Sequence, residues 1–141
     1  MTRSKSGLFL MELIIVIAFF AVTGAVCMQL FATAHRLSTR SMGLQMSVIN
    51  AQSAAEVFKM TRGNLSHMSD LLGADLQGTS LIMTYDDNWN PTSDETHIRF
   101  VIHVETNTEI VPATAVINVN DILLQEALYE LSVKGYFGRP E

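Results

Sequence analysis

Apolar side chains follow one another almost without interruption near the start of the chain. From Leu8 to Ala34, Glu12 is the one formally charged residue among Leu, Ile, Val, Phe, Ala, Met and a few small or amide side chains. A helix over residues 8–34 is about 40 Å long at 1.5 Å per residue, which is enough to cross a hydrocarbon layer of about 30 Å. The pattern therefore predicts a membrane-spanning helix in this segment.

After Ala34 the pattern becomes that of an amphipathic helix. Apolar positions recur at spacings of three, four and seven residues, and polar residues occupy the other faces. We predict one helix from Leu8 to about Arg62, ended by Gly63 and Asn64. Its apolar stripe is expected to pack on the distal part of the same chain, and it consists of Leu37, Leu44, Val48, Ala51, Ala55 and Phe58.

The rest of the chain shows the alternation of apolar and polar residues that is typical of strands. Residues 97–106 alternate most clearly, with Phe100, Ile102 and Val104 on the face that we assign to the core. Residues 65–78 are interpreted as a short helix or loop. The predicted strands cover residues 79–85, 97–106, 110–119 and 127–137.

Together these elements predict an α+β fold in which a long N-terminal helix packs on an antiparallel sheet of three or four strands. The strand region has only about 80 residues, so it needs the apolar stripe of the helix to complete a core. We expect one extracytoplasmic domain over residues 35–141, which includes the second half of the helix.

The distribution of charge limits the kinds of partner. The formal net charge is -5, but the first 61 residues hold five basic side chains against two acidic ones, and the remaining residues hold four against twelve. This acidic distal part argues against nucleic acid, because phosphate binding needs a basic face. Arg3 and Lys5 precede the apolar segment, so the short N-terminus is expected in the cytoplasm and the distal domain outside.

Glu12 separates three interpretations of the N-terminal segment. Ala32-Thr33-Ala34 offers a small-x-small cleavage pattern for a secretory signal peptide, but the apolar run is longer than the usual 7–15 residues or so of such a peptide. A plain signal anchor explains the length and the orientation. Neither interpretation explains an acid at this depth, which costs roughly 2.5–3.5 kcal/mol.

The third interpretation takes the residues together. A short basic leader ends in Gly7, a hydrophobic residue Leu8 follows, and Glu12 is the fifth residue from Leu8 at the head of a long apolar helix. This combination resembles the N-terminal segment of the type IV pilin-like family, which includes pilins and the pseudopilins of type II secretion and competence. Two features differ, since Leu8 stands where the family most often has Phe, and no proline is present to kink the helix.

The resemblance implies both processing and assembly. It implies a prepilin peptidase that cleaves after Gly7 and methylates the new terminus on Leu8, and a filament in which Glu12 meets the terminal amine of a neighbouring subunit. The implied partners are other pilin-like subunits in a homo- or hetero-filament, the peptidase, an assembly ATPase, a platform membrane protein and membrane lipid. The implied location is the cytoplasmic membrane, and the periplasm or cell surface after assembly.

The sequence favours a structural subunit, and a membrane-anchored extracytoplasmic binding module remains the alternative. We find no phosphate-binding loop, zinc spacing or nucleophile motif, and so expect no enzyme and no cofactor. Cys27 is the only cysteine and cannot form an intramolecular disulfide. His97 and His103 are expected about 20 Å apart on one strand, too far for a shared metal. The polar loop 86–95 opens like a calcium loop, but Pro91 stands where that loop needs glycine.

Overall fold

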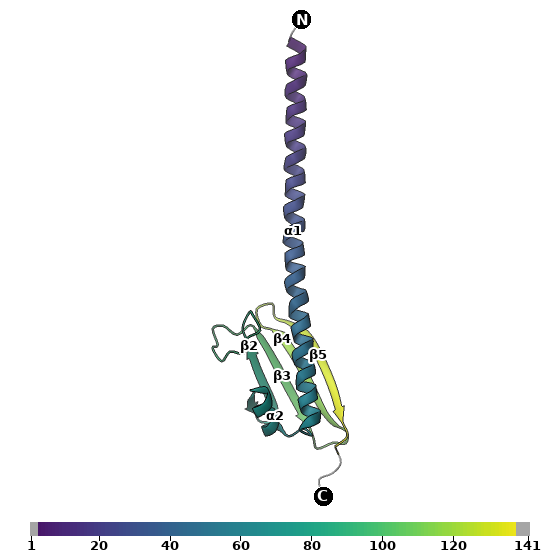
Figure 1. Ribbon diagram of the computed structural model, residues 1–141, viewed down its shortest axis with the longest axis vertical. Coiled ribbons are helices and arrows are strands. Elements are labelled where there is room, and N and C mark those ends of the chain that lie inside the picture. Colours follow the sequence, from purple (N-terminus) through teal and green to yellow (C-terminus); the bar gives the residue numbers. More distant parts are fainter. Residues whose placement is uncertain (1–2, 138–141) are drawn as a thin grey trace. The chain divides into compact units, whose positions relative to one another are not determined.

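The structure is a computed structural model that describes the backbone of residues 3–137 and the side chains of residues 5–137. It divides after Ser41 into two compact units, which are described separately. The elements in chain order (Figure 1) are α1 (Arg3–Met60), α2 (Leu65–Leu72), β1 (Asp75–Gln77), β2 (Ser80–Tyr85), β3 (Phe100–Asn107), β4 (Ala113–Asp121) and β5 (Glu126–Gly135).

The first unit consists of the N-terminal part of α1. Every described side chain from residue 5 to residue 41 is exposed, so between residues 8 and 34 the helix presents an almost wholly apolar surface on all sides. The hydroxyls of Thr23 and Thr33 donate to the carbonyls of Phe19 and Gln29, at 2.8 and 2.9 Å, which removes two polar donors from that surface. By length and composition, this helix can cross a membrane.

In the second unit, α1 buries a face made mostly of small residues. This face lies against the sheet and consists of Gly43, Ser47, Ala51, Ala54, Ala55 and Phe58. Ala51, Ala55 and Phe58 were predicted to be core residues, and all three are buried. Leu44 was predicted there too, but its side chain is 39% exposed because Gly43 and Ser47 occupy the buried positions of that turn.

Glycine and asparagine separate the two helices. α1 ends at Met60, slightly before the predicted end, and Gly63 has a positive φ of 76° with its N–H donating to the Phe58 carbonyl at 3.0 Å. The side chain of Asn64 then caps α2 by accepting from the N–H of His67 at 3.2 Å. Residues 65–78, predicted as a short helix or loop, thus contain α2 and the short strand β1.

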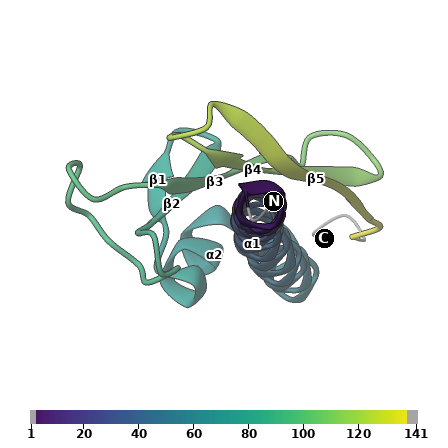
Figure 2. The same ribbon diagram turned by 90° about the horizontal axis from the view of Figure 1, so that it is seen from above.

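The five strands form an antiparallel meander in the order β1-β2-β3-β4-β5. Figure 2 shows α2 and the second-unit part of α1 on the same face of this sheet. The sequence predicted at most four strands, because β1 is only three residues long and carries no alternating pattern. The residues that point to the covered face are buried, and they include Leu81 and Met83 of β2, Phe100, Ile102 and Val104 of β3, Ala113, Ala115, Ile117 and Val119 of β4, and Val133 of β5.

The strand boundaries differ from the prediction mainly at β3. This strand begins at Phe100 rather than at residue 97, because His97 lies in a turn whose N–H donates to the Asp94 carbonyl at 3.0 Å. β4 and β5 differ by a few residues at either end. A bulge in β5 leaves Leu128 without a register partner, so that Ala127 pairs with Asn120 on the open face of the sheet.

Candidate functional site

The three residues that the sequence analysis assigned to processing and assembly all lie on α1. Gly7 and Leu8 are part of the continuous helix, and added methyl groups at Gly7 would meet nothing within 4 Å. Glu12 follows Leu8 by four residues, which is about 6 Å along the helix axis, and its side chain is exposed. Among the described residues, Glu12 has no ion-pair partner.

The surroundings of Glu12 are the apolar surface of the first unit. Leu8, Met11 and Ile15 stand within one turn of it and are all more than half exposed. An exposed apolar surface on every side of a helix is matched by lipid or by the apolar surfaces of other helices, not by water. Glu12 is therefore a single carboxylate in a surface whose other contacts are apolar.

A second cluster of polar residues lies in the loop between β2 and β3. The carboxylate of Asp86 accepts from the backbone N–H groups of Asn88 and Asn90, both at 2.8 Å, and from the Asn90 side chain at 3.2 Å. The hydrogen bond from the Asn90 backbone is the main cause of a lowered pKa at Asp86. In this structure the loop is closed by its own N–H donors, and within residues 5–137 no group of three potential ligands could hold a metal ion.

The same loop is anchored by its tryptophan. Trp89 is buried and stacks on the ring of Phe100, with 4.1 Å between the ring centroids. The centroid of the Tyr85 ring lies 5.7 Å from the centroid of the Trp89 ring. Burial raises the pKa of Tyr85. This contact explains how Trp89, with a φ of 63°, is held in a backbone conformation that is rare for a large side chain.

The two strand histidines predicted to share one face lie in different environments. His97 is in the loop, where its Nδ1 is 3.0 Å from a carboxylate oxygen of Asp94. Hydrogen bonds from Thr96 and His97 lower the pKa of Asp94 to about 2. His103 lies on the open face of β3, and its Nδ1 is 3.7 Å from Glu105. The placement of His97 on the strand was therefore wrong.

Arg99 and Asp121 form an ion pair at the end of β4 that the sequence analysis did not identify. Asp121 is buried, and it accepts from Arg99 Nε at 3.3 Å. The guanidinium also contacts the exposed Asp87 at 2.9 Å, and this hydrogen bond is the main cause of the raised pKa of Arg99. The sequence did contain a signal for the role of Asp121, because an Asp at the end of a strand commonly accepts hydrogen bonds from the backbone N–H groups that follow it.

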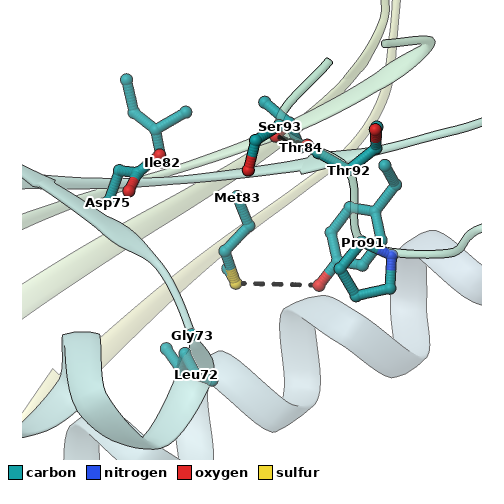
Figure 3. Close-up of a pocket in the computed structure, with 10 residues that line it drawn as sticks. Leu72, Gly73, Asp75, Ile82, Met83, Thr84, Pro91, Thr92 and Ser93 are labelled. Carbon is teal, nitrogen blue, oxygen red and sulfur yellow. Dashed lines mark hydrogen bonds between the residues drawn. The ribbon is translucent and has the colours of Figure 1, made fainter. Parts of the chain in front are cut away.

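A small hollow opens beside β2 (Figure 3). Its walls come from the end of α2, from β2 and from residues 91–93, with polar oxygens of Asp75, Thr92 and Ser93 around it. The Tyr85 hydroxyl donates to the Met83 sulfur at 3.8 Å along one side. The volume is about 140 Å³, below the roughly 300–1,000 Å³ of typical small-molecule sites.

Two regions therefore stand out in the described part of the chain, namely the apolar surface around Glu12 and the polar end of the sheet around Arg99. Of these two regions, only the one around Glu12 is part of an exposed apolar surface, whose contact with water is unfavourable. Comparisons with protein-family models, with curated proteins and with solved structures find no match to this chain.

Proposed function

We propose that this protein is a structural subunit of a type IV pilin-like or type II secretion-like filament, held in the membrane by α1 before assembly. The observation that carries the proposal is Glu12, an acid without a partner in its own described chain, on a helix that is otherwise apolar on all sides. The α+β domain, with a long helix on an antiparallel sheet, is compatible with the same family.

The free energy of burial explains why Glu12 needs a partner. A carboxylate at hydrocarbon depth costs roughly 2.5–3.5 kcal/mol on insertion scales. An ammonium at about 4 Å gives back roughly 4 kcal/mol at an effective dielectric constant of about 20. The two terms are of similar size, so a cation in contact with the acid offsets the cost of its burial.

The amino terminus of a neighbouring subunit supplies that cation in our proposal. Cleavage after Gly7 leaves the terminal amine on Leu8, about 6 Å along the axis from the Glu12 carboxylate of the same helix. A side chain that projects sideways from its helix reaches the terminus of an adjacent helix more readily than its own. Glu12 thus favours lateral assembly of subunits in a defined register.

In this proposal the orientation follows from the basic leader that precedes the apolar segment. Lys5 precedes the apolar segment, and His35, Arg36 and Arg40 follow it. Because the leader is short and basic, we propose that it faces the cytoplasm and that the second unit lies outside. The alternative, an anchored binding module, would need a ligand site on the second unit, and the hollow of about 140 Å³ beside β2 is small for one.

The decisive experiment replaces Glu12 by Gln in the host. This change keeps the shape of the side chain and removes its charge, so we expect normal membrane insertion and at least a tenfold loss of the protein from sheared filaments. Glu12→Asp retains the charge and should assemble better than Glu12→Gln. Met11→Gln places a new amide at the neighbouring position, and we expect it to assemble close to the wild-type level.

Intact-mass measurement of the same preparations tests the processing step. Mature protein should lack residues 1–7 and carry one methyl group on Leu8, in the wild type and in all three variants. A mature chain beginning at His35 would establish the signal-peptide interpretation instead. Wild-type recovery of Glu12→Gln in filaments would show that the carboxylate is not an assembly contact.

A further inference from the structure

The stretch of α1 that leads from the apolar segment into the second unit is made largely of residues that favour a helix only weakly. It covers residues 35–43, and we call it the joint. Four of its residues are Ser38, Thr39, Ser41 and Gly43. Relative to alanine, serine and threonine each lower the stability of a helix about two- to threefold, and glycine lowers it about fivefold. The joint therefore lacks the intrinsic preference that would keep it helical by itself.

Two residues of the joint weaken the helix in ways that the structure makes visible. The hydroxyl of Thr39 donates to the carbonyl of His35 at 3.1 Å, and a hydroxyl that bonds back in this way destabilises a helix slightly and often bends it. Gly43 lies in regular helix, and a methyl group added there would meet nothing within 4 Å. Since neither the backbone conformation nor the surroundings of Gly43 require a glycine, its main physical effect is to weaken the helix.

Burial of side chains does not stabilise the joint either. The side chains of residues 35–42 are all exposed, and even the apolar Leu37 and Met42 are 67% and 64% exposed. Further along α1, Ala51, Ala54 and Phe58 are fully buried. Most of the stability of a helix in a protein comes from its packed face. We therefore expect α1 to be held firmly from Ala51 to Phe58 and weakly in the joint.

Lipid does not stabilise the joint when α1 spans a membrane. The apolar segment ends at Ala34, and His35, Arg36 and Arg40 follow it, so the joint lies outside the hydrocarbon layer. A helix in hydrocarbon stays closed because its backbone groups would find no other partner there, whereas water supplies such partners. In water, helices shorter than about 12–15 residues are marginal unless packing stabilises them. The joint is thus a short hydrated stretch between two helical stretches that lipid and the core stabilise.

We propose that the joint is a hinge, at which α1 opens and re-forms while the membrane-spanning segment and the second unit keep their structures. The joint is helical in the structure, so the hinge opens from a helical state. A few weakly held residues are enough to absorb the changes in φ and ψ that turn one part of a protein relative to another. In a subunit that moves from the membrane into a filament, as proposed above, the hinge lets the second unit meet new neighbours without unfolding. The inference rests on membrane insertion of α1 and not on filament assembly, so the two can fail separately.

The experiment measures the distance between two spin labels in the full-length protein, held in phosphatidylcholine nanodiscs. Cys27→Ser removes the only native thiol. The test pair, His35→Cys and Gln52→Cys, places labels at two exposed positions with most of the joint between them. The control pair, Met11→Cys and Met28→Cys, has the same separation of 17 residues, and its positions in the apolar segment are 66% and 78% exposed. In a straight helix, the two positions of either pair are about 25 Å apart along the axis.

We expect the distance distribution of the test pair to be at least twice as wide as that of the control pair. A second variant replaces four residues of the joint by alanine, namely Ser38, Thr39, Ser41 and Gly43. In this variant the distribution of the test pair should narrow to the width of the control, and amide hydrogen exchange within the joint should slow at least about tenfold. Emission from the buried Trp89, the only tryptophan, reports that the second unit is folded in every sample.

Two results would overturn the proposal. The first is an equal width of the distance distributions for the test pair and the control pair in the protein with the native joint. The second is a wide distribution for the test pair that the four alanines leave unchanged, because the opening would then not depend on the weak helix preference of the joint.

Discussion

Phe58 is the one large side chain that α1 contributes to the buried face against the sheet, and its removal tests how much the helix stabilises the second unit. Its side chain is fully buried, and its ring meets that of Phe137 edge to face with 5.3 Å between centroids. Phe58→Ala leaves a cavity between α1 and the sheet, because neither the helix nor the sheet can move inward without breaking the other contacts of the core.

The expected loss is large compared with the stability of a small domain. Replacing a buried Phe by Ala costs about 3–5 kcal/mol, and a domain of this size is stable by about 5–15 kcal/mol in total. At roughly 4–8 °C per kcal/mol, the midpoint of thermal unfolding should fall by at least about 12 °C. The variant should still fold at low temperature if the wild type has ordinary stability.

The assay is thermal unfolding of a fragment of residues 36–141, followed by circular dichroism and by emission of Trp89. We expect this fragment to fold as a monomer, because the second unit is compact by itself. Met60→Ala is the control, since Met60 is near the same helix end and is 68% exposed, and its effect should stay within about 0.5 kcal/mol. Equal midpoints for Phe58→Ala and the wild type would refute the assignment of this helix face to the core.

Further substitutions and one titration test the ends of the sheet. Asp121→Ala should destabilise the fragment by about 2–4 kcal/mol because it removes the buried acceptor of Arg99 Nε and of the Leu123 and Leu124 N–H groups, whereas Asp87→Ala, at an exposed carboxylate on the same arginine, should cost less than about 1 kcal/mol in urea unfolding. Gly63→Ala should be clearly more destabilising than Gly78→Ala: both positions have positive φ, but only the first has a side chain within 3 Å of the added methyl group. The Asp94 carboxyl should titrate near 2 by carbon NMR, and because its folded pKa is lowered, its stabilising hydrogen bonds should persist above about pH 4 and be lost as the pH falls toward 2.

The periodic parts of the chain were predictable because one physical requirement dominates each of them. The all-apolar segment has to leave water, and the alternation at Phe100, Ile102 and Val104 allows one sheet face to be buried, as it is in the structure. The α+β fold, with its long helix on an antiparallel sheet, is confirmed. These features depend on the spacing of apolar residues and little on the identity of their neighbours.

The missed features depend on contacts that spacing does not reveal. β1 forms only because Gly78, with a φ of 63°, turns the chain so that three residues pair with β2. The role of Asp121 depends on Arg99, which is 22 residues away in the sequence. The N-terminal residues Gly7, Leu8 and Glu12 were found from their order alone, and their roles in processing and assembly stay predictions.

The small size of the buried residues of α1 has a consequence for how substitutions are tolerated. At Phe58 the interface is sensitive to lost volume, but at Ser47, Ala51 and Ala54, which are fully buried, it is sensitive to added volume. A change such as Ala51→Leu raises hydrophobicity and helix propensity at once, yet overpacking of this kind costs about 1–3 kcal/mol. Homologues that keep this packing should therefore vary freely in hydrophobic character on the exposed side of the helix while conserving small size on the buried side.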